Sequence, residues 1–132
     1  EGLVPDAATR LYDAINFVAS VYDEDELKVS SWRSKHMYFT LVICIGHIYQ
    51  PFDNLPETAL TPQVLANKEK LKSLLNVIAA DYATYSPQPK RASAPERLRD
   101  FIRASTLATT DTQARITRTK YVLKALEDGL VD

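Results

Sequence analysis

Apolar residues recur every three or four positions along most of this 132-residue chain, and this spacing constrains the fold more than any other feature. Such spacing places apolar side chains along one face of an α-helix. The chain has three glycines, two of them near its ends, and no Asn-Gly or Asp-Gly turn joins two alternating runs. Those turns are the main short-range signal for a β-hairpin. The sequence therefore predicts an all-α fold.

Length and composition indicate one helical domain over residues 1–132. Hydrophobic residues make up 45% of the chain and charged residues 25%, a balance typical of globular rather than disordered proteins. Cys44 is the single cysteine, so no internal disulfide can form, and we expect a cytoplasmic location. Because no run of about 20 apolar residues occurs, no transmembrane helix and no membrane partner are predicted.

About five helices are predicted, in a single-domain bundle. Prolines separate several of them, and Thr61 followed by Pro62 is typical of an N-cap and a first helical residue. Two further helices are predicted to start with a capping box, formed by Ser93 with Glu96 and by Thr110 with Gln113. The expected ranges are residues 6–22, 31–50, 61–85, 93–104 and 110–128, with Gly129 as the last C-cap.

The second predicted helix is apolar on nearly every face from Met37 to Tyr49. A helix of this kind is contacted from several sides, so we expect it to be the central helix of the bundle. Before it lies an acidic run, residues 23–26, at the end of the first predicted helix. A helix C-terminus disfavours negative charge, so the first helix is expected to end there.

No metal, cofactor or catalytic site is predicted. Cys44 and His47 are three residues apart, but His36 lies about 16 Å further along the same helix, and zinc requires about four converging ligands. The acidic run 23–26 lacks the glycine and the twelfth-position glutamate of a calcium loop. The sequence also lacks a glycine-rich phosphate loop and a Gly-x-Ser-x-Gly elbow, and Cys44 is expected to be buried.

The C-terminal third is strongly basic. Residues 90–124 carry nine lysines and arginines against three acidic residues, a formal charge of +6 in a chain of net charge −1. Arginines three or four residues apart share a helix face and can form bidentate contacts with phosphate or carboxylate groups. The predicted contacts to nucleic acid or another anion are Arg97, Arg99, Arg103, Arg115, Arg118 and Lys120.

Two alternatives to nucleic-acid contact remain open. Residues 1–26 carry seven acidic residues and one base, a formal charge of −6, so the two ends of the chain can neutralise each other. An acidic protein is a further possible partner. A separate hypothesis is an interaction or oligomerisation domain with no nucleic-acid role, in which exposed aromatic side chains form the contact surface. Those aromatic residues are Trp32, Tyr38, Tyr49 and Phe52.

Three segments carry a resemblance to a known family. They are RSKHMYFTLVI at residues 33–43, FIRAST at residues 101–106 and ARITRTKYVL at residues 114–123. Together they resemble the helical C-terminal part of the GmrSD-type, ParB-related restriction proteins. The resemblance implies a role in prokaryotic defence against foreign DNA. The family's Asp-Gly-Gln-Gln-Arg and His-Asn-His signatures do not occur here, so it implies a non-catalytic portion.

The sequence thus predicts a non-catalytic helical module of a larger prokaryotic DNA-processing or defence protein. Its basic C-terminal helices are expected to contact DNA or a neighbouring domain of the same protein. The chain opens at Glu1 without an initiator methionine, which agrees with a longer parent protein. The alternative function is protein interaction, including formation of a homo-oligomer.

Overall fold

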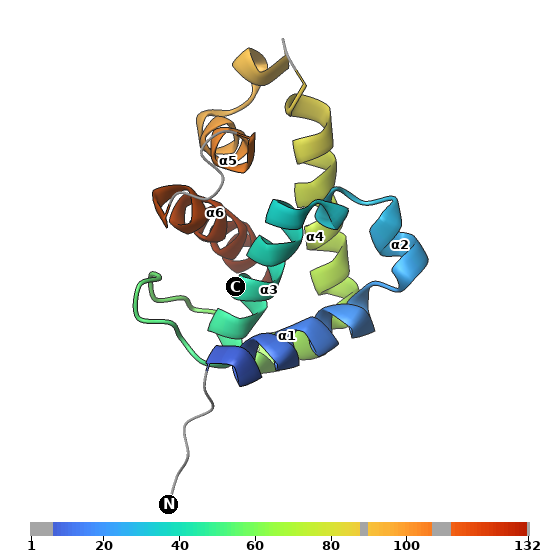
Figure 1. The fold of residues 1–132 in the computed structure, drawn as a ribbon, viewed down its shortest axis with the longest axis vertical. Helices are drawn as coiled ribbons and strands as arrows, with labels where there is room; N and C mark the ends of the chain where they lie inside the picture. Colours follow the sequence, from blue (N-terminus) through green and yellow to red (C-terminus); the bar gives the residue numbers. More distant parts are fainter. Residues whose placement is uncertain (1–6, 88–89, 107–111, 132) are drawn as a thin grey trace, which may run out of the picture.

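The structure, a computed structural model, describes residues 7–87, 90–106 and 112–131 and contains no β-strand in these ranges (Figure 1). The fold is all-α, as the apolar spacing predicts, and its longer helices correspond to the five predicted ones. The elements are α1 (Ala7–Val21), α2 (Glu24–Lys28), η1 (Ser31–Arg33), α3 (Lys35–Tyr49), η2 (Pro62–Ala66), α4 (Lys68–Tyr85), η3 (Lys90–Ser93), α5 (Glu96–Thr106) and α6 (Thr112–Leu130), where η marks a 3-10 helix.

The acidic run ends α1, as predicted, and also starts the short helix α2. The Asp23 carboxylate accepts a hydrogen bond from the Glu26 amide at 2.8 Å, and Glu26 Oε1 accepts one from the Asp23 amide at 3.0 Å. These bonds form a capping box. The acidic side chains therefore lie at a helix N-terminus, where the helix dipole favours negative charge.

The third predicted helix begins later than expected. Pro62–Ala66 forms a 3-10 turn, and Thr61 makes no side-chain capping bond. The side chain of Asn67 instead accepts a hydrogen bond from the Lys70 amide at 3.2 Å and caps α4. Thr61 and Pro62 thus begin a helical segment, as predicted, but it is a separate 3-10 turn, and the α-helix starts only after Asn67.

The capping box predicted for Ser93 was also wrong. The Ser93 hydroxyl donates to the Lys90 carbonyl at 2.8 Å inside η3. The helical bonding of α5 starts later, where the Arg99 amide donates to the Pro95 carbonyl at 2.9 Å. Thr110, the cap predicted for the last helix, lies outside the described residues.

Gly129 was predicted to be the C-cap of the last helix, but α6 continues to Leu130. Its role is to allow close packing against α4. A Cβ atom at position 129 would lie 2.5 Å from Leu74 Cδ2 and 2.6 Å from Cδ1. The glycine therefore lets the end of α6 approach Leu74.

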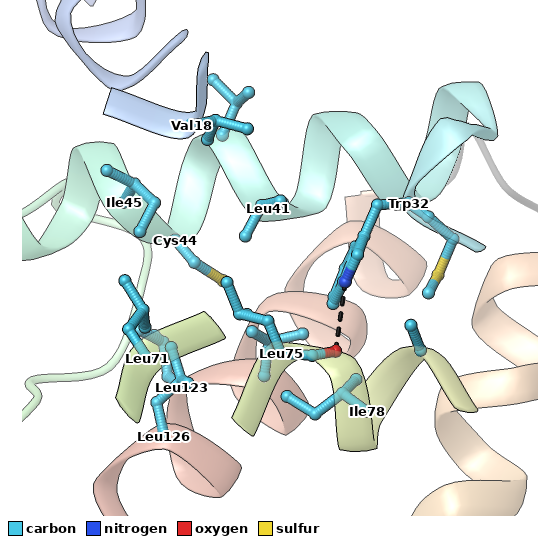
Figure 2. Close-up of a cluster of buried hydrophobic side chains, with 14 of the residues drawn as sticks. Val18, Trp32, Leu41, Cys44, Ile45, Leu71, Leu75, Ile78, Leu123 and Leu126 are labelled. Carbon is cyan, nitrogen blue, oxygen red and sulfur yellow. Dashed lines mark hydrogen bonds between the residues drawn. The ribbon is translucent and has the colours of Figure 1, made fainter. Parts of the chain in front are cut away.

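Two helices share the centre of the molecule. Nine of the 15 residues of α3 are buried, and α3 packs against α1, η1 and α6. This agrees with the central helix predicted from the sequence. In addition, α6 packs against α3, α4 and α5. Figure 2 shows Leu123 and Leu126 of α6 meeting Leu71 and Leu75 of α4 beneath α3.

Trp32 belongs to this core and not to a surface patch. Its side chain is fully buried, and its indole N–H donates to the Leu75 carbonyl at 3.1 Å (Figure 2). A buried indole N–H usually has a hydrogen-bond acceptor, and here the Leu75 carbonyl is that acceptor. The aromatic patch predicted from Trp32, Tyr38, Tyr49 and Phe52 is therefore not formed, because only Tyr49 among them is exposed.

Candidate functional site: a cleft and a basic surface on α6

Five of the six predicted contact residues are exposed, and Arg118 is not. Arg118 is 1% exposed. Its Nε donates to Thr40 Oγ1 at 3.0 Å and its Nη1 donates to the Ala104 carbonyl at 2.6 Å. The guanidinium thus joins α6 to α3 and to α5. Burial, together with the charge of Arg115, lowers the pKa of Arg118.

A signal for this burial is present in the sequence. Arg118 lies four residues from both Ala114 and Val122, which are buried on the core face of α6. Residues four apart on a helix share a face, so position 118 belongs to the core stripe. Placing Arg118 among the outward-facing contacts was therefore wrong.

The exposed basic residues do not gather at one point. Arg115 and Lys120 are five residues apart, so they lie on different sides of α6, roughly 140° apart. Arg99 and Arg103 share the outer face of α5, where both are exposed. Arg97 and Tyr121 line the same surface pocket, where burial and the charge of Asp81 raise the pKa of Tyr121 and the charge of Arg97 lowers it by less.

A cleft of about 300 Å³ lies between α3, the segment 50–60 and the N-terminal half of α6. Apolar side chains form its walls: Phe39, Ile43, Phe52, Leu55 and Ile116. Polar groups from the same elements also line it, including Thr40, Arg115 and Arg118. An apolar cleft with a few converging polar groups is the usual form of a small-molecule site. No pattern in the sequence predicted this cleft, because its lining comes from three separate segments.

Hydrogen bonds hold the segment that forms one wall of the cleft. His47 Nδ1 accepts from the Phe52 amide at 2.9 Å, and its Nε2 lies 2.8 Å from the Pro56 carbonyl. Because the first nitrogen accepts and the carbonyl can only accept, the imidazole is neutral with its proton on Nε2. Arg10 stacks over the Phe52 ring at 4.4 Å.

The far end of the same segment is tied to α6. The Thr58 hydroxyl donates to Glu127 Oε2 at 2.6 Å, and the Ala59 amide donates to the same oxygen at 3.0 Å. Hydrogen bonds to a carboxylate are stronger than those between neutral groups. The wall of the cleft is thus bonded at both ends and does not depend on a ligand for its position.

His36 lies on the first turn of α3, one turn before Thr40 of the cleft lining, and the Thr40 hydroxyl donates to the His36 carbonyl at 2.8 Å. The N-terminal half of α6, which carries Arg115 and Arg118, packs against α3, and Arg118 bonds to the same Thr40. Partial burial and the charges of Arg118, Lys35 and Arg115 lower the pKa of His36. The predicted contact residues did not include Lys35 or His36.

Cys44 and His47 do not form a metal site. The Cys44 thiol is buried 3.7 Å from the Thr119 carbonyl, and burial raises the pKa of the thiol, so the reactive thiolate is disfavoured. Both nitrogens of His47 are bonded to the segment 50–60. Within the described ranges, no three His, Cys, Asp or Glu side chains are grouped to hold a metal ion.

The acidic and basic thirds do not pair with each other in the ion pairs described. Glu26 pairs with Lys72 of α4, and Glu24 pairs with Lys28 at 3.5 Å within α2. In the basic third, Arg103 lies 3.9 Å from Asp100, with side chains 70% and 57% exposed. Such exposed pairs contribute about 0–1 kcal/mol. In Figure 1, α2 lies on the opposite side of the molecule from α5 and α6.

Comparisons with protein families, with curated proteins and with solved structures found no match to this chain. The resemblance to restriction proteins therefore stays a prediction from residue pattern. In the part of the chain that the structure describes, none of the helices has the length and apolar character needed to cross a bilayer.

Proposed function

We propose that this chain is a non-catalytic binding module that contacts DNA through the exposed basic side chains of α5 and α6. The observation that carries the proposal is the exposure of Arg97, Arg99, Arg103 and Lys120. Phosphate contacts by arginine and lysine supply most of the affinity of proteins for DNA. The module belongs to a larger DNA-processing or defence protein in the cytoplasm.

The arrangement of the other charges supports this proposal. The acidic helix α2 lies across the molecule from α5 and α6 (Figure 1), and its Glu26 pairs with Lys72 of α4, so these carboxylates are not neighbours of the basic helices. The pair between Asp100 and Arg103 is too exposed to hold Arg103 away from a phosphate. The basic segment therefore keeps its charge available to a polyanion.

The proposal predicts how steeply the affinity for DNA falls as the salt concentration rises. Each phosphate contact contributes a slope of about −0.9 when log K is plotted against log salt. Contacts by Arg99 and Arg103, which share one face of α5, give a slope of roughly −2. Since phosphate contacts carry little sequence information, affinity is expected to differ little between duplexes of different sequence.

Fluorescence anisotropy with a labelled duplex tests the proposal. The Arg99→Gln/Arg103→Gln variant is expected to bind more weakly and to reduce the salt slope by roughly 2. The matched control, Lys28→Gln/Lys70→Gln, removes the same charge from exposed positions on α2 and α4. Absence of binding at low salt, or equal weakening by both variants, contradicts DNA contact at this surface.

A second candidate function is self-association or protein interaction through α1. Tyr12 is 66% exposed and Ile15 is 40% exposed, and their spacing places them on neighbouring positions of the helix surface. Light scattering tests this candidate. A dimer that dissociates in the Tyr12→Ser/Ile15→Ser variant supports it, and a monomer at high concentration contradicts it.

A further inference from the structure

The cleft beside α6 combines two properties that the DNA-binding proposal does not use. Its walls are aromatic and branched apolar side chains, including Phe39, Phe52 and Ile116, and two arginines line it. Contact with the phosphate backbone of DNA requires only the positive charge of the arginines. A ligand that uses both properties must carry an apolar body and a negative group.

We propose that this cleft binds a small organic carboxylate with an aromatic or branched apolar body. The volume of about 300 Å³ is at the lower limit of ligand pockets, which are usually ~300–1,000 Å³. A macromolecular segment would need a longer groove. The size therefore favours a compact ligand.

Arg115 is the residue that we assign to the carboxylate. It lines the cleft and is exposed, so its guanidinium can form bidentate bonds with a carboxylate. Arg118 also lines the cleft, but its Nε and Nη1 donate to Thr40 and Ala104. Arg118 therefore adds positive potential at the cleft, while Arg115 supplies the direct contact.

The apolar body of the ligand has partners on all three elements of the cleft. Phe52 is held by the bond from its amide to His47 and by the stacked Arg10 guanidinium. Ile43 of α3 and Ile116 of α6 also line the cleft. Because the wall is fixed before binding, a ligand loses less free energy in ordering it.

His36 provides a direct report of the bound charge. The nearby arginines lower the pKa of its imidazole, and a carboxylate bound at Arg115 offsets part of their charge. Binding is therefore expected to raise the pKa of His36. Together with changes at the cleft-lining Ile43 and Ile116, this readout reports a charge bound beside Arg115.

NMR titration of the 132-residue chain with phenylacetate tests the proposal. Saturable shifts are expected for the methyl groups of Ile43 and Ile116, together with a rise in the pKa of His36. Phenylacetamide lacks the charge, and acetate and inorganic phosphate lack the apolar body, so each is expected to bind at least about tenfold more weakly. Equal binding of any of these three, or no saturable shift at millimolar phenylacetate, overturns the proposal.

Two charge variants separate this site from the DNA surface. Arg115→Gln is expected to weaken phenylacetate about tenfold, while Arg103→Gln, on the outer face of α5, leaves it unchanged. Both residues are exposed, so neither change is expected to unfold the protein. Equal effects of the two variants overturn the assignment of Arg115. DNA affinity, in contrast, is expected to respond to Arg103→Gln, so the two proposals fail independently.

Discussion

At the scale of single residues, the most unusual feature is a buried arginine that connects three helices. Arg118 donates to Thr40 on α3 and to Ala104 on α5. Ala104 lies in the last turn of α5, where helical carbonyls lack a partner within the helix. The guanidinium therefore supplies donors to two acceptors on neighbouring helices, and its burial is structural.

Arg118→Ala is expected to lower the free energy of unfolding by about 3 kcal/mol. The change removes a buried packed side chain and leaves Thr40 and the Ala104 carbonyl with fewer donors. Urea unfolding measures the effect. Arg115→Ala, three residues away and exposed, is the matched control and is expected to change stability by less than ~0.5 kcal/mol. Equal losses in both variants would show that the buried bonds contribute little.

His36 gives the fold a pH dependence of known sign. Partial burial and the charges of Arg118, Lys35 and Arg115 lower its pKa in the folded state below the unfolded value of about 6.5. As pH falls through about 6.5, the unfolded chain takes up the proton first, so the free energy of unfolding decreases. This decrease ends below the folded pKa of His36.

His36→Gln is expected to reduce that loss of stability. Urea midpoints at about pH 7.5 and 5.5, compared between the wild type and the variant, isolate the contribution of this imidazole from those of the carboxylates. A histidine pKa measured by NMR provides the direct value, and Arg115→Gln is expected to raise it. An unchanged pH dependence in His36→Gln would contradict the assignment.

At the scale of elements, local capping and close packing decide where helices start and end. Asn67 rather than Thr61 caps α4, and the acidic run starts α2 with a capping box. Gly129 shows the effect of packing, since a residue that often ends helices lies within α6. The neighbouring Leu74 side chain explains why a Cβ atom at position 129 would be crowded.

Gly129→Ala is expected to destabilise the wild type by about 1 kcal/mol. Alanine gains about 1 kcal/mol in helix propensity, but the new Cβ requires Leu74 to move, and overpacking costs about 1–3 kcal/mol. In the Leu74→Ala background the same substitution is expected to stabilise by up to about 1 kcal/mol. Thermal or urea unfolding of the four proteins forms a double-mutant cycle, and additive effects would exclude contact between these positions.

At the scale of the whole molecule, the fold keeps charges of opposite sign apart. The acidic run lies on α2, across the molecule from the basic helices α5 and α6 (Figure 1). Glu26 is paired with Lys72 on α4, so neutralisation occurs between neighbouring elements. The helices that carry most of the basic residues of the segment 90–124 thus lie on the side of the molecule away from α2, although Arg115 and Lys120 lie on different sides of α6 and Arg118 is buried.

The sequence by itself determined the helical class, most helix ranges and the central position of α3, because apolar spacing is a local property that each helix must satisfy to bury one face. It did not determine which long side chains turn inward. The burial of Trp32 and Arg118 depends on Leu75, Thr40 and Ala104, which are distant in sequence. The cleft, likewise, exists only where α3, the segment 50–60 and α6 meet. Tertiary structure decided these features because burial of a polar group requires partners that only the folded chain brings within bonding distance.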